Sequence, residues 1–446
     1  MSSMPMAMSR TAEWCWVCLA FLLLNMAYAS GQPVDLREGR GYDGQIYHAM
    51  AKAMPRELPP PGVAPFVYRI GMPLVAAGLA KSQDWVITAG FDRLNLALNA
   101  VSVILLTLLL QRHVTSVFAR VVVIVAFMVE PHSPLRLSYV HPLSTDPAAL
   151  AGLLAGLTGI DWFQSRPGRR RAALLAVLVA IGVTFHEVML VVGVCVLVSA
   201  VAAQASGQQL RPAGWRGPLV ALLATGAWIP LASGIAALAV VHAWVVPTPS
   251  DYSVSAEVLR WFREKSFLQY GLSWFLVFGP LLMVPAFCWR SSAGFLRERP
   301  VFLAYLSMCA GLAWLGGGQT ERLLALASPV VYTLIARALI AVPIGPASVA
   351  MAGIVLAQGL SSRVFSPIGG PIEPPVVRTE VWERLGSANV AWGLSYQNMW
   401  SQLCAPAMID IYLLWYGITA AGLLALLWYR TRGTGRSEPL TTPEVA

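Results

Sequence analysis

The stretch WCWVCLAFLLLNMAYA (Trp14–Ala29) decides the fold, because it is uninterrupted by charge and is followed, after eleven residues, by the polar motif GYDGQIY (Gly41–Tyr47). The same contrast runs through all 446 residues, of which 57% are hydrophobic and only 12% are charged. The mean hydropathy is +0.63. Soluble domains carry roughly a quarter charged residues, so this composition is typical of a chain that lies in lipid.

Many apolar runs approach the roughly 20 residues that a helix needs to cross a bilayer. The sequence therefore predicts an all-α, polytopic bundle of about 11–12 transmembrane helices, in which residues 1–446 form a single transmembrane domain. Three of the runs (117–130, 172–185 and 346–359) are short, and we expect them to be tilted, broken or re-entrant. The predicted spans are 12–30, 92–111, 117–130, 142–163, 172–185, 187–203, 217–242, 268–288, 301–316, 322–341, 346–359 and 408–429.

The distribution of arginine predicts the orientation of this bundle. The net charge of +9 does not indicate nucleic-acid binding, because most of the excess lies in short loops, where it sets topology. The arginine-rich side is expected to be cytoplasmic and to hold both termini, with a tail at 430–446. Its arginines are Arg112, Arg120, Arg166, Arg169, Arg170, Arg171, Arg211, Arg216, Arg290, Arg297, Arg299, Arg337, Arg430, Arg432 and Arg436. The other side is expected to be external, with a first loop at 31–91, a loop at 243–267 and a last loop at 360–407.

The N-terminal segment allows two interpretations. Arg10, the apolar run and Ala27-Tyr28-Ala29 resemble a cleavable signal peptide. An uncleaved anchor is favoured, because the basic region before the apolar run is weak. Of the six cysteines, Cys15 and Cys18 are spaced as Cys-x-x-Cys and the rest are far apart, so all are interpreted as small buried apolar residues rather than metal ligands.

The first external loop is too long for a simple connection. Residues 44–54 have the pattern of a short amphipathic helix lying in the membrane interface, and residues 70–80 are apolar but only half a span long. The loop is therefore predicted to contain two interfacial helices.

Asp43 is the first of several polar residues on the external side. It lies between Gly41 and Gly44, which let the backbone turn tightly and approach a ligand. It either caps a helix that begins at Gly44 or acts as a functional carboxylate. Gln45 and His48, on the same face of that helix, favour the functional interpretation.

Asp146 belongs to the run HPLSTDP (His141–Pro147). An Asp before a proline is typical of a helix N-cap, which is one interpretation of Asp146. His141 either pairs with Asp146 or lies in the headgroup region.

Two further pairs interrupt apolar sequence. His186-Glu187 either is functional, since ionisable residues in a membrane are costly, or forms a tight turn in water. Glu321 suits the first turn of a helix, where it complements the macrodipole. Arg322 opposes the macrodipole there, and its position favours contact with an anion such as a phosphate.

Motifs of soluble enzymes, such as a P-loop or His-Glu-x-x-His, are not found. The motif YDGQIY (Tyr42–Tyr47) and the segment YRIGMPL (Tyr68–Leu74) instead resemble the GT-C type of polytopic glycosyltransferase. Thr145-Asp146-Pro147, His186-Glu187 and the run from Glu321 to Pro329 fit the same type. The chain departs from the family pattern by lacking an Asp-x-Asp pair in the first loop and a large soluble C-terminal domain.

The resemblance implies a donor sugar on a polyprenyl phosphate or diphosphate and transfer to a cell-envelope glycan or glycolipid at the external face of a bacterial-type inner membrane. It also implies that Asp43 is the catalytic base. Arg69, Arg322 or Arg40 would neutralise the departing phosphate, and Gln45, His48, His141, Asp146, His186, Glu187 and Glu321 would line the substrate site. A divalent metal is possible but has no motif, and no nucleic-acid partner is expected.

Two other functions remain open. A transporter or flippase for a lipid-linked or small polar substrate should carry ionisable residues near the middle of the membrane. A polysaccharide polymerase or ligase should centre on the last external loop, 360–407.

Overall fold

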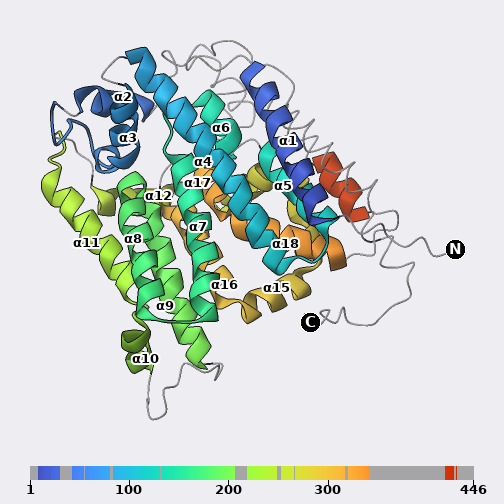
Figure 1. The fold of residues 1–446 in the computed structure, drawn as a ribbon. Coiled ribbons are helices and arrows are strands. Elements are labelled where there is room, and N and C mark those ends of the chain that lie inside the picture. Colours follow the sequence, from blue (N-terminus) through green and yellow to red (C-terminus); the bar gives the residue numbers. More distant parts are fainter. Residues whose placement is uncertain are drawn as a thin grey trace.

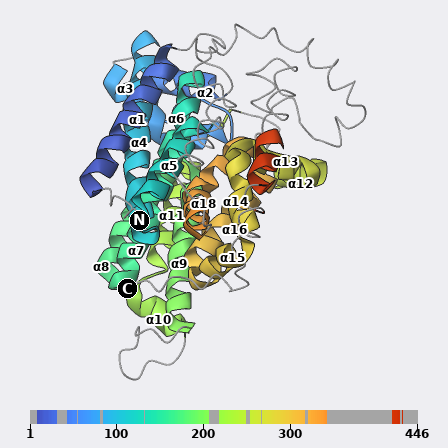
Figure 2. The same ribbon diagram turned by 90° about the vertical axis from the view of Figure 1, so that its right-hand side faces the viewer.

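The computed structural model describes residues 9–30, 43–54, 56–80, 84–130, 133–205, 218–248, 253–265, 267–316, 320–341, 417–425 and 428. All regular structure in this part of the chain is helical (Figures 1 and 2). The predicted spans 346–359 and most of 408–429, the loop 360–407, the tail 430–446 and Arg40 lie outside the described residues.

The first half of the chain contains α1 (Arg10–Ser30), α2 (Gly44–Ala53), α3 (Gly71–Ala80), α4 (Asp84–His113), α5 (Val117–Val129), α6 (Pro134–Val140), α7 (Asp146–Ser165), α8 (Arg169–Phe185) and α9 (Leu190–Ala205). The second half contains α10 (Pro218–Thr225), α11 (Ile229–Trp244), α12 (Val254–Glu264), α13 (Phe267–Phe278), α14 (Met283–Phe287), α15 (Trp289–Glu298), α16 (Pro300–Leu315), α17 (Thr320–Leu324) and α18 (Ser328–Ala341). Short 3₁₀ turns lie at η1 (Phe66–Tyr68), η2 (Glu187–Met189), η3 (Gly279–Leu282) and η4 (Ala325–Ala327).

Several of these helices could cross a membrane, which makes the chain consistent with a multi-pass membrane protein. Within the described residues, five are long and apolar enough: Arg10–Ser30, Val86–His113, Val117–Tyr139, Glu187–Gln204 and Thr320–Ile340. Counting the pair Ser273–Phe287 and Trp289–Glu298 as one span, although it bends by 91°, gives six. Helices α11 and α16 are also apolar but shorter, with 16 residues each, and are not included in this count. The prediction of 11–12 spans stays a prediction.

The surface of the bundle carries apolar stripes at helical spacing. On α8, Leu174, Val177 and Ile181 are 54%, 56% and 57% exposed, and α1 and α4 carry similar rows. A stripe of this kind would be a liability in water but suits contact with lipid. Cys15 and Cys18 lie exposed on α1, so their predicted burial was wrong, because α1 turns this face outward.

Helices α1 and α5 run parallel, held at both ends. At one end Arg120 donates to Glu13 through Nε and Nη2, each at 2.6 Å, and at the other the Tyr28 hydroxyl donates to the Met128 carbonyl at 2.7 Å. Arg120 and Glu13 are both buried. The interpretation of Arg120 as a loop charge was therefore wrong: it lies inside helix α5 and is neutralised by α1.

The bundle has two chemically different ends. Helices α2 and α3 lie at the upper end in Figure 1, and α10 and α15 lie at the lower end in both views. We call the upper end the Asp43 end and the lower end the Arg112 end, where Arg112 of α4 donates to Asp161 of α7 at 3.3 Å. Helix α4 also binds α7 near the Asp43 end, because Asn95 donates to the carbonyls of Pro142 and Ser144. The two helices therefore run parallel.

Helices α2 and α3 fall within one residue of the helices predicted at 44–54 and 70–80. They pack on α4 and α11 through a second apolar cluster, separate from the main core, that includes Tyr47, Met50, Met72 and Phe91. Gly71 begins α3 directly against the Phe185 ring, where an added Cβ would lie 2.6 Å from Cδ2. This close approach brings the segment before α3 beside the end of α8.

Two elements differ from the sequence prediction. The stretch predicted as one span at 268–288 is interrupted by η3, which contains Pro280, and the chain then turns sharply into α15. Proline removes a backbone donor and breaks a helix. The predicted loop 243–267 contains α12, whose outward residues Val258, Leu259 and Phe262 are apolar.

Candidate functional site

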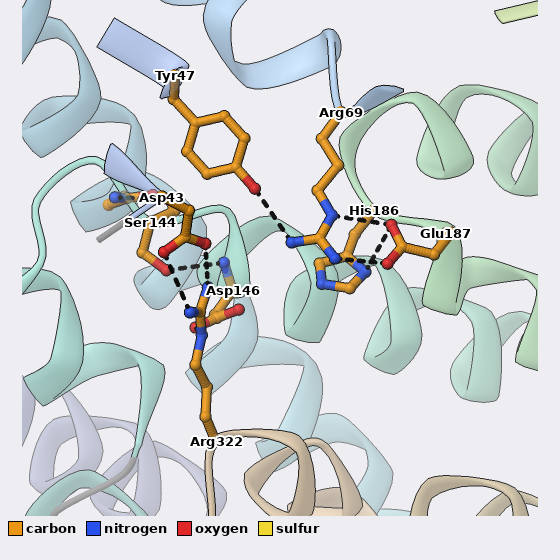
Figure 3. A network of polar contacts seen from close by, with 9 residues as sticks. Asp43, Tyr47, Arg69, Ser144, Asp146, His186, Glu187 and Arg322 are labelled. Carbon is orange, nitrogen blue, oxygen red and sulfur yellow. Dashed lines mark hydrogen bonds and ion pairs between the residues drawn. The ribbon is translucent and has the colours of Figure 1, made fainter. Parts of the chain in front are cut away.

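The charged residues of the Asp43 end come from the first turns of different elements (Figure 3). Asp43 immediately precedes α2, Asp146 begins α7, Glu187 begins η2, and Arg322 lies in α17. Carboxylates at helix N-termini are favourable because the backbone N–H groups there carry partial positive charge. The fold brings these termini together with Arg69, which follows η1.

Arg322 lies between two carboxylates. Its Nη2 donates to Asp43 Oδ2 at 3.1 Å and its Nη1 approaches Asp43 Oδ1 at 3.4 Å, while its Nε donates to Asp146 Oδ2. All three side chains are largely buried, with 15%, 10% and 6% of Arg322, Asp43 and Asp146 exposed. The expected contact of Arg322 with an anion is therefore made here by two carboxylates of the protein itself.

Asp43 does not cap α2 with its side chain. Its carbonyl accepts hydrogen bonds from Ile46 and Tyr47, and its carboxylate turns instead to Arg322. Burial acts to raise the pKa of Asp43, but the guanidiniums of Arg322 and Arg69 outweigh it and hold the pKa below its usual value. Asp43 is therefore a carboxylate at neutral pH. It holds the N-cap position before Gly44, as the capping interpretation placed it, but that interpretation was wrong about its side chain, which makes no cap hydrogen bond.

Asp146 is the first residue of α7, and the cap position belongs to Thr145, whose side chain makes no cap hydrogen bond. The backbone N–H of Asp146 donates to Ser144 Oγ at 3.1 Å. The side-chain carboxylate of Asp146 faces Arg322, whose Nε donates to Oδ2. The N-cap interpretation of Asp146 was wrong, because α7 begins at Asp146 itself and not at the proline that follows it.

Arg69 forms the second cationic centre. Its Nε donates to Glu187 Oε2 at 2.9 Å, its Nη2 donates to Glu187 Oε1 at 2.5 Å, and its Nη1 donates to the Tyr47 hydroxyl at 3.0 Å. Burial lowers the pKa of Arg69, but Glu187 raises it well above its usual value, so the guanidinium stays charged. Burial raises the pKa of Tyr47 to about 12. The Glu187 side chain is 44% exposed, so this pair reaches the surface of the site.

Both histidines of the site are neutral at pH 7. Burial, helped by Arg69, lowers the pKa of His186 to about 4, and burial with Arg322 lowers the pKa of His141 to about 4. The His186 Nδ1 accepts the Val188 N–H at 3.3 Å, so its 3.5 Å approach to Glu187 is not an ion pair. His186 is buried and Glu187 is half-exposed. The interpretation of this pair as a turn with both side chains in water was therefore wrong for His186.

The remaining candidates lie on α17 and α2. Glu321 is buried and accepts a hydrogen bond from Ser273 Oγ at 2.8 Å, so it faces α13. His48 is buried on α2 and Gln45 is partly exposed.

Sequence reasoning missed Tyr47, Ser144 and Asn95. Asn95 is fully buried on α4 and holds the connection before α7 through the carbonyls of Pro142, at 2.7 Å, and Ser144, at 3.2 Å. The signal was present, since Asn95 and Asn99 are one helical turn apart in an apolar run, and buried amides in a membrane helix need partners. Both donate toward the α6–α7 region.

Among the described residues, no group of three or more His, Cys, Asp or Glu side chains lies close enough together to hold a metal ion. Over the residues that the structure describes, the fold is all-helical, several apolar helices could cross a membrane, and a group of charged residues meets at one end. Comparison of the chain with known protein families, with curated proteins and with solved structures finds no match.

Proposed function

We propose that the protein is an integral-membrane glycosyltransferase that transfers a sugar from a polyprenyl-phosphate or polyprenyl-diphosphate donor to a cell-envelope glycan or glycolipid. In this proposal the Asp43 end faces the outside of a bacterial-type inner membrane, and both termini lie in the cytoplasm. The proposal takes its reaction class from the resemblance of residues 42–47 and 68–74 to GT-C glycosyltransferases.

The single observation that carries the proposal is the environment of Asp43. It is a carboxylate that makes no helix-capping hydrogen bond and lies beside two buried guanidiniums, at the end of an apolar bundle. Transfer from a phosphate-linked sugar needs a base, cations for the leaving group and an apolar path for the lipid. Asp43 supports the role of base and the two guanidiniums support the role of cations, while the apolar surface of the bundle is the proposed path for the lipid.

The proposed reaction follows from these groups. Asp43 accepts the proton of the acceptor hydroxyl as the acceptor oxygen bonds to the anomeric carbon of the sugar. The bond from that carbon to the phosphate oxygen breaks, and its electron pair leaves with the phosphate. A positioned general base contributes about 10²–10⁴-fold to the rate, and Arg322 and Arg69 stabilise the phosphate in a water-poor site. Neutral His141 and His186, with Gln45 and His48, are the proposed hydrogen-bonding partners of the substrates.

The experiment compares lipid-linked sugars and envelope glycans of a strain lacking the protein with those of its parent. The strain is complemented with wild-type protein, with Asp43→Asn or with the control Asp161→Asn at the opposite end. We expect the deletion to change a glycan, Asp161→Asn to restore it, and Asp43→Asn to lose at least about 100-fold of the transfer, the lower range of a lost general base. Expression and membrane insertion, followed by immunoblot of membranes, should be unchanged. Near-normal transfer by Asp43→Asn would remove Asp43 from the role of base.

One observation favours transport of a lipid-linked or small polar substrate as a second candidate function. Glu130 is fully buried beside α18, where Tyr332 donates to its Oε2 at 2.9 Å, and its Oε1 has no hydrogen-bond partner within the described residues. Buried ionisable residues in membrane proteins often lie on transport paths. Glu130→Gln should abolish substrate movement into vesicles if the protein is a transporter and leave sugar transfer near normal if it is a transferase.

A further inference from the structure

The two edges of the Arg322 guanidinium bind different carboxylates. The Nη1–Nη2 edge faces both oxygens of Asp43, at 3.4 and 3.1 Å, whereas Nε takes one oxygen of Asp146 (Figure 3). A guanidinium binds carboxylates and phosphates in the same bidentate manner, through two parallel N–H···O hydrogen bonds. Asp43 therefore occupies the edge of Arg322 that a phosphate would use.

The cations of the site are already neutralised. Arg322 binds Asp43 and Asp146, and Arg69 binds Glu187, so these three carboxylates and two guanidiniums leave one negative charge in excess. A further anion that joined this group without displacing a carboxylate would meet like charge among largely buried side chains, which is strongly unfavourable. Anion binding therefore requires one carboxylate to leave its arginine.

Asp43 is the carboxylate that can leave. Its contacts with Arg322 are the longer ones, and its side chain makes no hydrogen bond to the start of α2. Asp146 lies in the first turn of α7, in a connection that Asn95 holds from α4. Of the two carboxylates on Arg322, Asp43 thus has fewer restraints than Asp146 and is the one to be displaced.

We propose that an anionic group, the phosphate of a lipid-linked donor, displaces Asp43 from the Nη1–Nη2 edge of Arg322 while Asp146 remains on Nε. The role of the freed Asp43 as the base rests on the proposed function. The exchange couples the two events, because Asp43 becomes a stronger proton acceptor only after the donor phosphate has taken its arginine. Proton transfer to Asp43 without a bound donor is thereby suppressed.

The exchange makes anion binding depend on pH. Asp43 is faced by Arg322, Arg69, Tyr47, His141 and Asp146. Once Arg322 turns to the anion, burial is no longer offset and the pKa of Asp43 rises; below this raised pKa the complex takes up a proton, whereas above it Asp43 stays ionised and can act as the base. Affinity for the anion should therefore rise as the pH falls from the pKa of Asp43 in the anion-bound protein toward its lower pKa in the free protein. Tyr47, with its pKa of about 12, and His141, with its pKa of about 4, do not titrate between pH 5 and 8.

The test measures binding of farnesyl phosphate, a short prenyl phosphate, to the full-length protein in detergent by calorimetry, with farnesol as the uncharged control. We expect Asp43→Asn to bind farnesyl phosphate at least about tenfold more tightly, since a neighbouring opposite charge is worth about 1–3 pKa units, each a factor of ten. Asp146→Asn should gain less affinity for farnesyl phosphate than Asp43→Asn, and the affinity of Asp161→Asn should match that of the wild type. Farnesol affinity should be equal in all four proteins.

The wild-type affinity should also rise from pH 8 to pH 6 more steeply than that of Asp43→Asn, and this comparison cancels the titration of the probe itself. If Asp43→Asn folds poorly, the pH dependence of the wild-type affinity can still be measured by itself. Equal or weaker binding by Asp43→Asn, or a larger gain in Asp146→Asn, overturns the exchange. Tighter binding by Asp43→Asn together with normal sugar transfer would support the exchange but would contradict the proposal that Asp43 is the catalytic base. Lost transfer without tighter binding would reject the exchange alone.

Discussion

At the scale of single residues, buried arginines in this chain are tolerated because carboxylates reach them from elsewhere. Glu13 binds Arg120 with both oxygens, Glu187 binds Arg69 in the same way, and two aspartates share Arg322. An unpaired buried charge would cost several kcal/mol, whereas a pair on the surface contributes little.

The Glu13–Arg120 pair allows a direct measurement of this difference. We expect Glu13→Gln to lower the free energy of unfolding by about 3–5 kcal/mol, because it leaves the Arg120 guanidinium buried and unpaired. The matched control is Glu257→Gln, which breaks the exposed 3.1 Å pair with Arg260 on α12 and should cost about 0.5 kcal/mol or less. Thermal unfolding of the purified protein in detergent measures both. A similar loss for the two variants would contradict the burial argument.

The sequence could mark these residues but not their partners. An ionisable side chain in an apolar chain stands out, which is why Asp43, His186, Glu187 and Arg322 were candidates. Their partners are far along the chain: 107 positions separate Arg120 from Glu13, 118 separate Arg69 from Glu187, and 279 separate Arg322 from Asp43. Only the packing of helices decides such contacts. For the same reason Arg120 was misread as a loop charge.

At the scale of elements, the site depends on where helices break. The α8 helix ends at Phe185, and the chain then passes through His186 into η2, which presents Glu187 to Arg69. Gly71, at the start of α3, packs against Phe185 and holds the segment carrying Arg69 at this break. The contact between two short elements thus sets the position of one cationic centre.

A single methyl group tests this contact. Gly71→Ala should destabilise the protein by about 1–3 kcal/mol, because its Cβ would collide with the Phe185 ring. Gly78→Ala on the same helix is the control: nothing lies within 4 Å of its added Cβ, and alanine favours a helix over glycine by up to about 1 kcal/mol. Unfolding midpoints of the two variants in detergent should move in opposite directions. If Gly71→Ala were neutral, the close packing of α3 on α8 would be disproved.

Helix periodicity predicted α2 and α3 closely, because both are locally amphipathic or apolar. It missed α12, although Val254, Val258, Leu259 and Phe262 follow a helical spacing. The sharp turn between α14 and α15 had no comparable signal, since each half is helical by itself.

At the scale of the whole molecule, the parallel pairs α1–α5 and α4–α7 create two different ends. The Asp43 end gathers carboxylates, arginines and neutral histidines, while the Arg112 end carries Asp161, Arg112 and the Glu13–Arg120 pair. A protein built in this way should place its two ends on opposite sides of a membrane.

Cysteine labelling tests that arrangement. In a full-length chain with its native cysteines replaced, Glu57→Cys, exposed after α2, should react with a membrane-impermeant maleimide in intact cells. Arg290→Cys, exposed on α15, should react only after permeabilisation, since arginine-rich ends stay in the cytoplasm. Labelling of both positions from one side would contradict the two-ended arrangement, and the reverse pattern would contradict the proposed orientation.

The sequence by itself determined that this chain is helical and apolar enough to cross a membrane several times, because composition and local periodicity act over a turn or two of helix. It also singled out Asp43, Asp146, Glu187 and Arg322 as charges out of place in such a chain. Only the tertiary structure decided that Arg322 is held by two aspartates and Arg69 by a glutamate. Charges inside a poorly polarisable bundle must be paired, and which pairs form depends on helix ends that the chain brings together from distant positions.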